Sequence, residues 1–79
     1  MNKEQVFSFV SSVLSDYLGS EEVLKEDMSL RNDLGLDSLD TIDLALKCER
    51  KFDIQIPDDV VENFSTVGEV VQYICASKE

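Results

Sequence analysis

The chain has 79 residues, of which 43% are hydrophobic and 30% charged, so it can bury one small core and we expect a single domain over residues 1–79. Seventeen acidic residues against seven basic ones give a net charge of −10, which argues against binding to nucleic acid or to an anionic membrane surface. The chain has no histidine, so the common serine–histidine and cysteine–histidine nucleophile pairs cannot form, and we expect no autonomous enzyme.

The first predicted element is an amphipathic helix over residues 6–18. Apolar residues recur there at spacings of three and four, which is typical of a helix with one buried face: Val6, Phe7, Phe9, Val10, Val13, Leu14, Tyr17 and Leu18. Gly19 is expected to end this helix. Residues 1–5 lack the apolar segment of a signal peptide, and no window approaches the roughly 18 apolar residues of a membrane span. We therefore expect a cytoplasmic protein.

Residues 19–37 are predicted to form a long loop. Its polar sequence is interrupted by scattered apolar residues that should attach it to the core: Val23, Leu24, Met28, Leu30, Leu34 and Leu36. A loop of this length without secondary structure is uncommon in a small domain and is usually functional, so its far end is the first place to look for a site.

A second helix is predicted to start after Asp37, whose carboxylate can cap free backbone N–H groups, with Asp40 favourable in the first turn. Its inward stripe is expected to be Leu39, Ile42, Ala45, Leu46 and Phe52.

The remainder is predicted to be an extended connector over residues 54–57, one or two helical turns over residues 58–64, and a last helix. The last helix is indicated by the capping-box pair Thr66 and Glu69, followed by apolar residues at helical spacing. The predicted fold is therefore all-α, a small bundle of three main helices and one short helix. The side chains expected in its core are Phe7, Leu39, Ile42, Leu46, Phe52, Ile56, Val60, Val61, Phe64, Val71 and Ile74.

Two cysteines, Cys48 and Cys75, make neither a disulfide framework nor a metal-ligand pattern, so we expect small core residues or free thiols and no metal site.

Ser38 directly follows the capping Asp37, at the end of the long loop. Serine is common at helix N-termini for purely structural reasons, because it caps well. A hydroxyl there is also exposed, and a phosphate attached to it would meet the positive end of the helix dipole and free N–H groups. Position alone does not decide between a structural serine and an attachment site.

The residues around Ser38 are informative. The segment Asp33-Leu34-Gly35-Leu36-Asp37-Ser38-Leu39 resembles the phosphopantetheine attachment motif of acyl carrier proteins. Residues 37–44, 52–58 and 65–74 are similar to that family's second helix, the loop after it and the start of its last helix. Length, acidity and helix order agree as well, so the resemblance extends over nearly the whole chain.

The resemblance implies an acyl-carrier-protein-like fold with a long loop between helices one and two. It also implies that Ser38 carries a 4′-phosphopantetheine arm, transferred from coenzyme A by a phosphopantetheinyl transferase with Mg²⁺, and that Asp37 helps to present the serine. The thiol of the arm would hold an acyl group as a thioester for fatty-acid or related lipid biosynthesis. The chain would then be a monomeric carrier with no catalytic residue of its own.

In the resembled family the second helix docks on acyl-transfer and fatty-acid synthase enzymes that have basic docking patches, which implies docking roles for Leu39, Asp40 and Asp43. Asp40 and Asp43 share a helix face, although such a charge run is often only a solvated surface. The second half of this helix departs from the family pattern, because Lys47, Arg50 and Lys51 stand where many fatty-acid carriers are acidic.

That departure keeps two alternatives open within the carrier class, namely a carrier for a polyketide or aminoacyl group and one for a dedicated lipid pathway. An acidic calcium-binding or interaction module belongs to a different class. Residues 32–43 lack the ligand spacing and terminal glutamate of a calcium-binding loop, which weakens that alternative.

Overall fold

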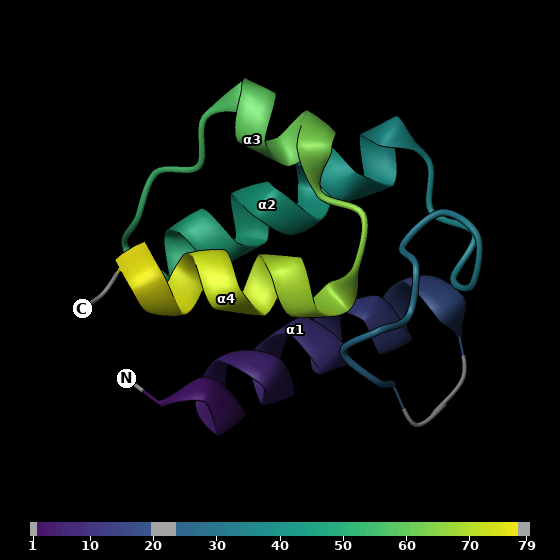
Figure 1. Cartoon of the computed structure of the whole chain (residues 1–79), viewed down its shortest axis with the longest axis horizontal. Helices are drawn as coiled ribbons and strands as arrows, with labels where there is room; N and C mark the ends of the chain where they lie inside the picture. Colours follow the sequence, from purple (N-terminus) through teal and green to yellow (C-terminus); the bar gives the residue numbers. More distant parts are fainter. Residues whose placement is uncertain (1, 20–23, 78–79) are drawn as a thin grey trace.

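The computed structural model describes residues 2–19 and 24–77, and the regular structure in these ranges is four α-helices. They are α1 (Lys3–Leu18), α2 (Ser38–Phe52), α3 (Asp58–Asn63) and α4 (Val67–Ser77). α1 packs against α4 and α2, and the short α3 packs on α2 (Figure 1). The expected all-α fold of three main helices and one short helix, with a long loop after the first, is confirmed. The described parts contain no helix that is long and apolar enough to cross a membrane.

α1 begins three residues earlier than its apolar stripe predicted. Asn2 caps it, because the Asn2 side chain accepts the Gln5 N–H at 2.8 Å and the Gln5 side chain accepts the Asn2 N–H at 3.4 Å. This capping box satisfies two N–H groups that would otherwise lack partners in the first turn. The other end is where it was expected: Gly19 adopts a left-handed conformation with φ of 68° and donates its N–H to the Ser15 carbonyl.

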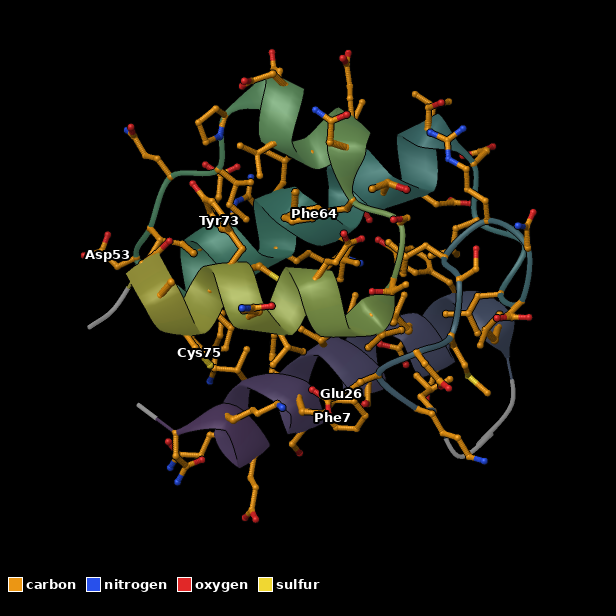
Figure 2. All side chains as sticks on the ribbon, viewed as in Figure 1. Phe7, Glu26, Asp53, Phe64, Tyr73 and Cys75 are labelled. Carbon is orange, nitrogen blue, oxygen red and sulfur yellow. The ribbon has the colours of Figure 1, made fainter. Side chains whose placement is uncertain are left out.

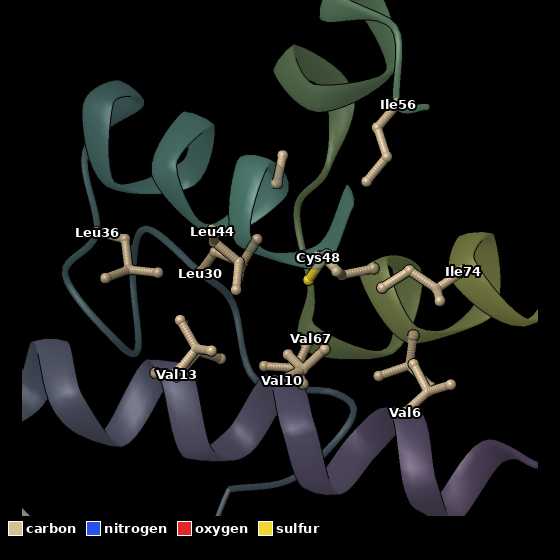
Figure 3. Close-up of a cluster of buried hydrophobic side chains, with 14 of the residues drawn as sticks. Val6, Val10, Val13, Leu30, Leu36, Leu44, Cys48, Ile56, Val67 and Ile74 are labelled. Atoms are coloured by element: carbon tan, nitrogen blue, oxygen red, sulfur yellow. The ribbon is translucent and has the colours of Figure 1, made fainter. Parts of the chain in front are cut away.

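One hydrophobic core is shared by all four helices and the long loop. The close-up in Figure 3 shows Val6, Val10 and Val13 pointing from α1 toward α2 and α4. The buried apolar residues are Val6, Val10, Val13, Leu14, Leu24, Leu30, Leu34, Leu36, Leu44, Ala45, Cys48, Phe52, Ile56, Val61, Val67, Val70, Val71 and Ile74. Three other residues expected in the core, Phe7, Val60 and Phe64, pack against it and are only partly buried.

The inward face of α2 was predicted correctly at Ala45 and Phe52 and wrongly at the three other positions. Leu39, Ile42 and Leu46 are 76%, 46% and 48% exposed, so they belong to the outer surface and not to the core. The residues that α2 buries are Thr41, Leu44, Ala45, Cys48 and Phe52. A polar residue lies in this face because the Thr41 hydroxyl donates to the Asp37 carbonyl at 3.0 Å, which satisfies it inside the protein.

The long loop is attached to the start of α4 by backbone hydrogen bonds. The N–H groups of Leu30, Val67 and Gly68 donate to the carbonyls of Ser65, Met28 and Glu26 at 2.8, 3.1 and 2.8 Å. The Glu26 carboxylate also pairs with Lys3 of α1 at 2.8 Å, and Glu26 lies beside Phe7 (Figure 2). Of the expected apolar anchors, Leu24, Leu30, Leu34 and Leu36 are buried, Met28 is half-buried, and Val23 lies outside the described residues.

The C-terminal third follows its prediction. Residues 54–57 are extended, and α4 starts at the expected capping box, in which the Glu69 N–H donates to the Thr66 hydroxyl and the Thr66 N–H donates to the Glu69 carboxylate. The rings of Phe64 and Tyr73 meet edge to face with centroids 5.9 Å apart (Figure 2). Both cysteines are free thiols, with Cys48 buried and Cys75 half-buried.

Candidate functional site

The turn that precedes α2 is held firmly by the core. Leu34 and Leu36 are buried on either side of Gly35, which adopts a left-handed conformation with φ of 70° that favours glycine. The Leu36 N–H donates to the Leu30 carbonyl at 2.9 Å. The chain therefore enters α2 from a fixed position at one end of the molecule, where the loop and α2 meet (Figure 1).

Asp33 stabilises the loop just before this turn. Its carboxylate accepts the Ser29 N–H at 2.7 Å, and the N–H groups of Asp33 and Leu34 both donate to the Ser29 carbonyl at 3.1 Å. The Ser29 hydroxyl in turn accepts the Asn32 N–H at 3.1 Å. Asp33 thus has a structural role in the loop.

Asp37 caps α2 as the sequence predicted, and Asp40 completes the cap. The Asp37 carboxylate accepts the Asp40 N–H at 2.9 Å, while the Asp40 carboxylate accepts the Asp37 N–H at 3.3 Å. Ser38 and Leu39 lie between them, and within the described residues their backbone N–H groups have no acceptor. Two N–H groups at the positive end of the helix therefore remain open to an anionic group bonded to Ser38.

Ser38 is the first residue of α2 and is exposed, and its hydroxyl makes no hydrogen bond within the described part of the chain. The hydroxyls of Ser11, Ser29 and Ser65 differ in this respect. The Ser11 hydroxyl is buried, the Ser29 hydroxyl accepts the Asn32 N–H, and the Ser65 hydroxyl donates to the Glu69 carboxylate at 2.6 Å. The hydroxyl at position 38 is therefore free to become an ester.

The surroundings of the Ser38 hydroxyl are acidic and hold no histidine. The chain has no histidine, and the described ranges hold no cluster of three or more side chains suited to binding a metal ion. A covalently attached phosphate fits the site, since the side chain is exposed and the helix N-terminus favours negative charge.

The outer face of α2 carries an exposed apolar stripe beside Ser38. It consists of Leu39, Ile42 and Leu46, whose spacings of three and four keep them on one face. Exposed apolar side chains gathered in this way on a small acidic protein indicate a contact surface for a partner. Sequence periodicity assigned these residues to the core because it records spacing and not which way the helix is turned.

Asp43 is bonded within the protein, which the sequence did not reveal. The Tyr17 hydroxyl of α1 donates to its carboxylate, and the Lys47 ammonium pairs with it at 3.2 Å. The Tyr17 hydrogen bond, followed by the Lys47 hydrogen bond, lowers the pKa of Asp43 below its usual value. Burial, followed by the bond to Asp43, raises the pKa of Tyr17. The Lys47 ammonium also lies 4.8 Å from the centroid of the Tyr17 ring.

The three basic residues in the second half of α2 have different surroundings. Lys47 is paired with Asp43, and the Lys51 ammonium lies 5.7 Å from the centroid of the Phe9 ring of α1. Arg50 is exposed, and it has no ion pair in the described parts of the chain.

A cavity of about 290 Å³ lies between α2 and α3. Ile42, Ala45, Leu46, Ile56 and Val61 give it an apolar lining, and its carboxylates come from Glu49, Asp58 and Glu62. Ile42 and Leu46 thus take part both in the exposed stripe and in this cavity.

Comparison with known proteins agrees with this geometry. A family model described as "Phosphopantetheine attachment site" matches residues 8–74. An acyl carrier protein from Prochlorococcus marinus (strain MIT 9515) is 43% identical over 79 residues, which cover 99% of both chains.

Solved structures of acyl carrier proteins are similar as well. The protein from Enterococcus faecalis is 27% identical with a TM-score of 0.82, over 98% of this chain and 99% of that one. The protein from Thermotoga maritima, at 23% identity, supports the fold alone, with a TM-score of 0.86 over 99% of this chain and 92% of that one.

Proposed function

Because this chain belongs to the acyl carrier protein family and contains its phosphopantetheine attachment domain, we propose that Ser38 is the residue that bears the 4′-phosphopantetheine arm. The observation that carries the proposal is the exposed Ser38 hydroxyl at the first position of α2, free of hydrogen bonds to the described residues. The match of residues 33–39 to the attachment motif supports the same position.

The arm, when attached, supplies a thiol that holds an acyl group as a thioester. The residues of the chain bind and present it. Asp37 fixes the start of α2 and so directs the Ser38 side chain outward, and the open N–H groups of Ser38 and Leu39 lie next to the ester phosphate. The carboxylates of Asp37 and Asp40 add negative charge there, which suits recognition by a basic transferase site that also holds Mg²⁺.

Acyl carrier proteins are carriers and not catalysts, and they interact with phosphopantetheinyl transferases and synthase enzymes. We propose that this chain docks on such enzymes through α2, with Leu39 supplying apolar contact and Asp40 supplying most of the charge; Asp43, which the sequence also suggested, is the weaker contributor. The exposure of Leu39 supports this role. The paired state of Asp43 limits its charge available to a partner.

We further propose that the cargo is a fatty-acyl or related lipid chain, handled in the cytoplasm. The apolar lining of the cavity between α2 and α3 supports a hydrophobic cargo, since the cavity adjoins the face that starts at Ser38. A dedicated lipid, polyketide or aminoacyl pathway is the second candidate, and the observation that favours it is the basic second half of α2 at Lys47, Arg50 and Lys51.

Incubation with coenzyme A, Mg²⁺ and a broad-specificity phosphopantetheinyl transferase tests the attachment residue. Intact mass should increase by one phosphopantetheine, and peptide mass spectrometry should place it on Ser38. The Ser38→Ala variant should keep its helical circular dichroism and gain no mass. Modification of Ser11, Ser12, Ser29 or Ser65 instead would contradict the proposal.

A further inference from the structure

We propose that α2 recognises a partner protein whose docking surface is basic at one end, apolar in the middle and acidic at the other end. This inference rests on the proposed carrier function and names the chemistry of its partner. The surface of α2 concerned, here called the α2 stripe, begins at Asp40 beside Ser38, continues through Leu39, Ile42 and Leu46, and ends at Arg50.

The apolar and basic parts of the α2 stripe lie in one line. Leu46 follows Leu39 by seven residues and Arg50 follows Leu46 by four, so all three project from the same side of the helix. All three are exposed, and Leu39 is 76% exposed. Leu39 and Arg50 are eleven residues apart, which places them about 16 Å apart along the helix axis, a span that one docking surface can cover.

The negative charge in the middle of α2 is partly offset by a paired lysine. Asp43 would be the second acidic contact of the helix, but its carboxylate accepts from Tyr17 and pairs with Lys47 at 3.2 Å. The acidic side chains at the Ser38 end, Asp37 and Asp40, have no paired cation within the described residues, and the other carboxylates near the stripe, those of Glu49, Asp58 and Glu62, line the cavity between α2 and α3.

Arg50 is distinguished from the other two basic residues by its direction. Lys47 and Lys51 lie over aromatic rings of α1, with their ammonium groups 4.8 Å from the Tyr17 centroid and 5.7 Å from the Phe9 centroid. Arg50 lies on the outer line of Leu39 and Leu46, and the described residues offer it no ion pair. Lys47 and Lys51 are exposed as well, but Arg50 is the basic residue on the line of Leu39 and Leu46.

Charge complementarity then defines the occupant. A docking patch that is basic along its whole length would place a positive group against Arg50, and like charges facing each other in an interface are unfavourable. The partner that fits therefore has basic groups that pair with Asp40 of the α2 stripe and with the adjacent Asp37, and a carboxylate that pairs with Arg50.

The test uses the phosphopantetheinylated carrier and an acyltransferase of a dissociated fatty-acid synthase whose docking surface is basic throughout. Arg50→Glu and Lys51→Glu are matched variants, because each changes the net charge from −10 to −10 − 2 = −12 and each places a glutamate in the last turn. Circular dichroism confirms that both are folded, and kcat/KM for acylation is measured over a salt series.

We expect Arg50→Glu to raise kcat/KM at low ionic strength by roughly fivefold, while Lys51→Glu changes it by less than about twofold, because a facing charge acts on the association rate. The difference should disappear in high salt. In a second arm, enzyme variants that each reverse one basic docking residue to glutamate are compared. One of them should prefer the wild-type carrier to Arg50→Glu.

Equal effects of the two carrier variants would mean that net charge and not the position of Arg50 matters, and would overturn the proposal. An unchanged or lower rate for Arg50→Glu, or no enzyme variant that reverses the preference, would also overturn it. Intact mass is measured first: a carrier that never gains the arm contradicts the proposed function, whereas loaded variants with equal rates contradict only this inference.

Discussion

The Tyr17 hydroxyl donates a hydrogen bond to the Asp43 carboxylate and so joins the last turn of α1 to the middle of α2. Lys47 completes the contact by pairing with Asp43 and lying over the Tyr17 ring. These two helices are consecutive in the chain but are separated by the long loop. The contact therefore fixes α2 directly to α1, without relying on the loop.

Replacing Tyr17 with phenylalanine should destabilise the protein. Tyr17→Phe keeps the ring beneath Lys47 and removes only the hydroxyl that serves Asp43, so we expect the melting temperature to fall by about 4–8 °C. Tyr73→Phe is the matched control, because that hydroxyl makes only a long 3.5 Å contact to the Gln55 carbonyl. Equal melting temperatures for the two variants would show that the Tyr17 bond contributes no stability.

Glu69 should make the stability of the α4 cap depend on pH. Its carboxylate accepts from the Ser65 hydroxyl, the Ser65 N–H and the Thr66 N–H, and these bonds lower its pKa. A carboxyl whose pKa is lowered by folding adds stability that is complete above its unfolded pKa of about 4.3 and is lost as pH falls through the folded value. The stability advantage of wild type over Glu69→Gln should therefore shrink below about pH 5.

Urea denaturation at several pH values between 7 and 3 measures this advantage. Glu62→Gln on α3 serves as the control, because the Glu62 carboxylate is exposed and has no hydrogen-bond partner among the described residues. A difference between wild type and Glu69→Gln that stays constant over the whole range would contradict the prediction.

Gly68→Ala should loosen the attachment of the long loop. A Cβ atom at position 68 would lie 3.0 Å from the Glu26 carbonyl oxygen and 3.1 Å from the Glu26 Cβ, and that same carbonyl accepts the Gly68 N–H at 2.8 Å. We expect a loss of about 1 kcal/mol of unfolding free energy, because the strain outweighs the better helix propensity of alanine.

Hydrogen exchange locates the effect of this change. The amides of Leu30 and Val67, which cross between the loop and α4, should exchange faster in Gly68→Ala, while that of Leu36 should change less. If these amides exchange at the same rates in wild type and in Gly68→Ala, the loop accommodates the added methyl group without loss of stability.

The two cysteines should differ in reactivity. Burial raises the pKa of the Cys48 thiol to about 12, so at pH 8 only about one molecule in 10⁴ carries the reactive thiolate at that position. Iodoacetamide should therefore label the folded protein without its arm once, on Cys75, and label both cysteines in urea. Cys75→Ser should leave the folded protein unlabelled, and labelling of Cys48 as fast as Cys75 would contradict the prediction.

The sequence predicted those features that local signals determine. Thr66 and Glu69 gave the start of α4, and Gly19 gave the end of α1, because caps depend on residues a few positions apart. The place of Ser38 in the first turn of α2 was predictable for the same reason, because Asp37 directly before it is a capping residue. Asn2 was missed as the cap of α1 because the prediction started from the apolar stripe and not from the capping residue.

Features that depend on how the helices pack against one another could not be predicted from local sequence signals. Leu39 and Leu46 satisfy helical periodicity as well as Leu44 and Cys48 do, and only packing against α1 decides which pair is buried. The bond between Tyr17 and Asp43 spans 26 positions of sequence, and no local pattern specifies it. The same packing leaves Arg50 exposed on the outer side of α2.

Asp40 and Asp43 should differ as docking residues, although the sequence treats them alike. The Asp40 charge lies at the start of α2 beside Ser38, whereas Asp43 is paired with Lys47 and bonded to Tyr17. We therefore expect Asp40→Asn to slow modification by a basic phosphopantetheinyl transferase by about two- to fivefold at low salt, because it removes a charge that steers encounter. An asparagine oxygen can still accept the Asp37 N–H, so the cap is retained.

Asp43→Asn should instead lower stability and leave the rate of modification close to that of Asp59→Asn, a variant on α3 with the same loss of charge. Rates are measured over a salt series, at a temperature where circular dichroism shows all variants folded. Only for Asp40→Asn should the rate of modification depend less steeply on salt concentration than it does for wild type. With one carboxylate fewer facing the basic transferase, salt has less attraction to screen. If Asp43→Asn slows modification as much as Asp40→Asn does, then the Tyr17 and Lys47 contacts leave the Asp43 charge available, and docking extends further along α2 than the geometry indicates.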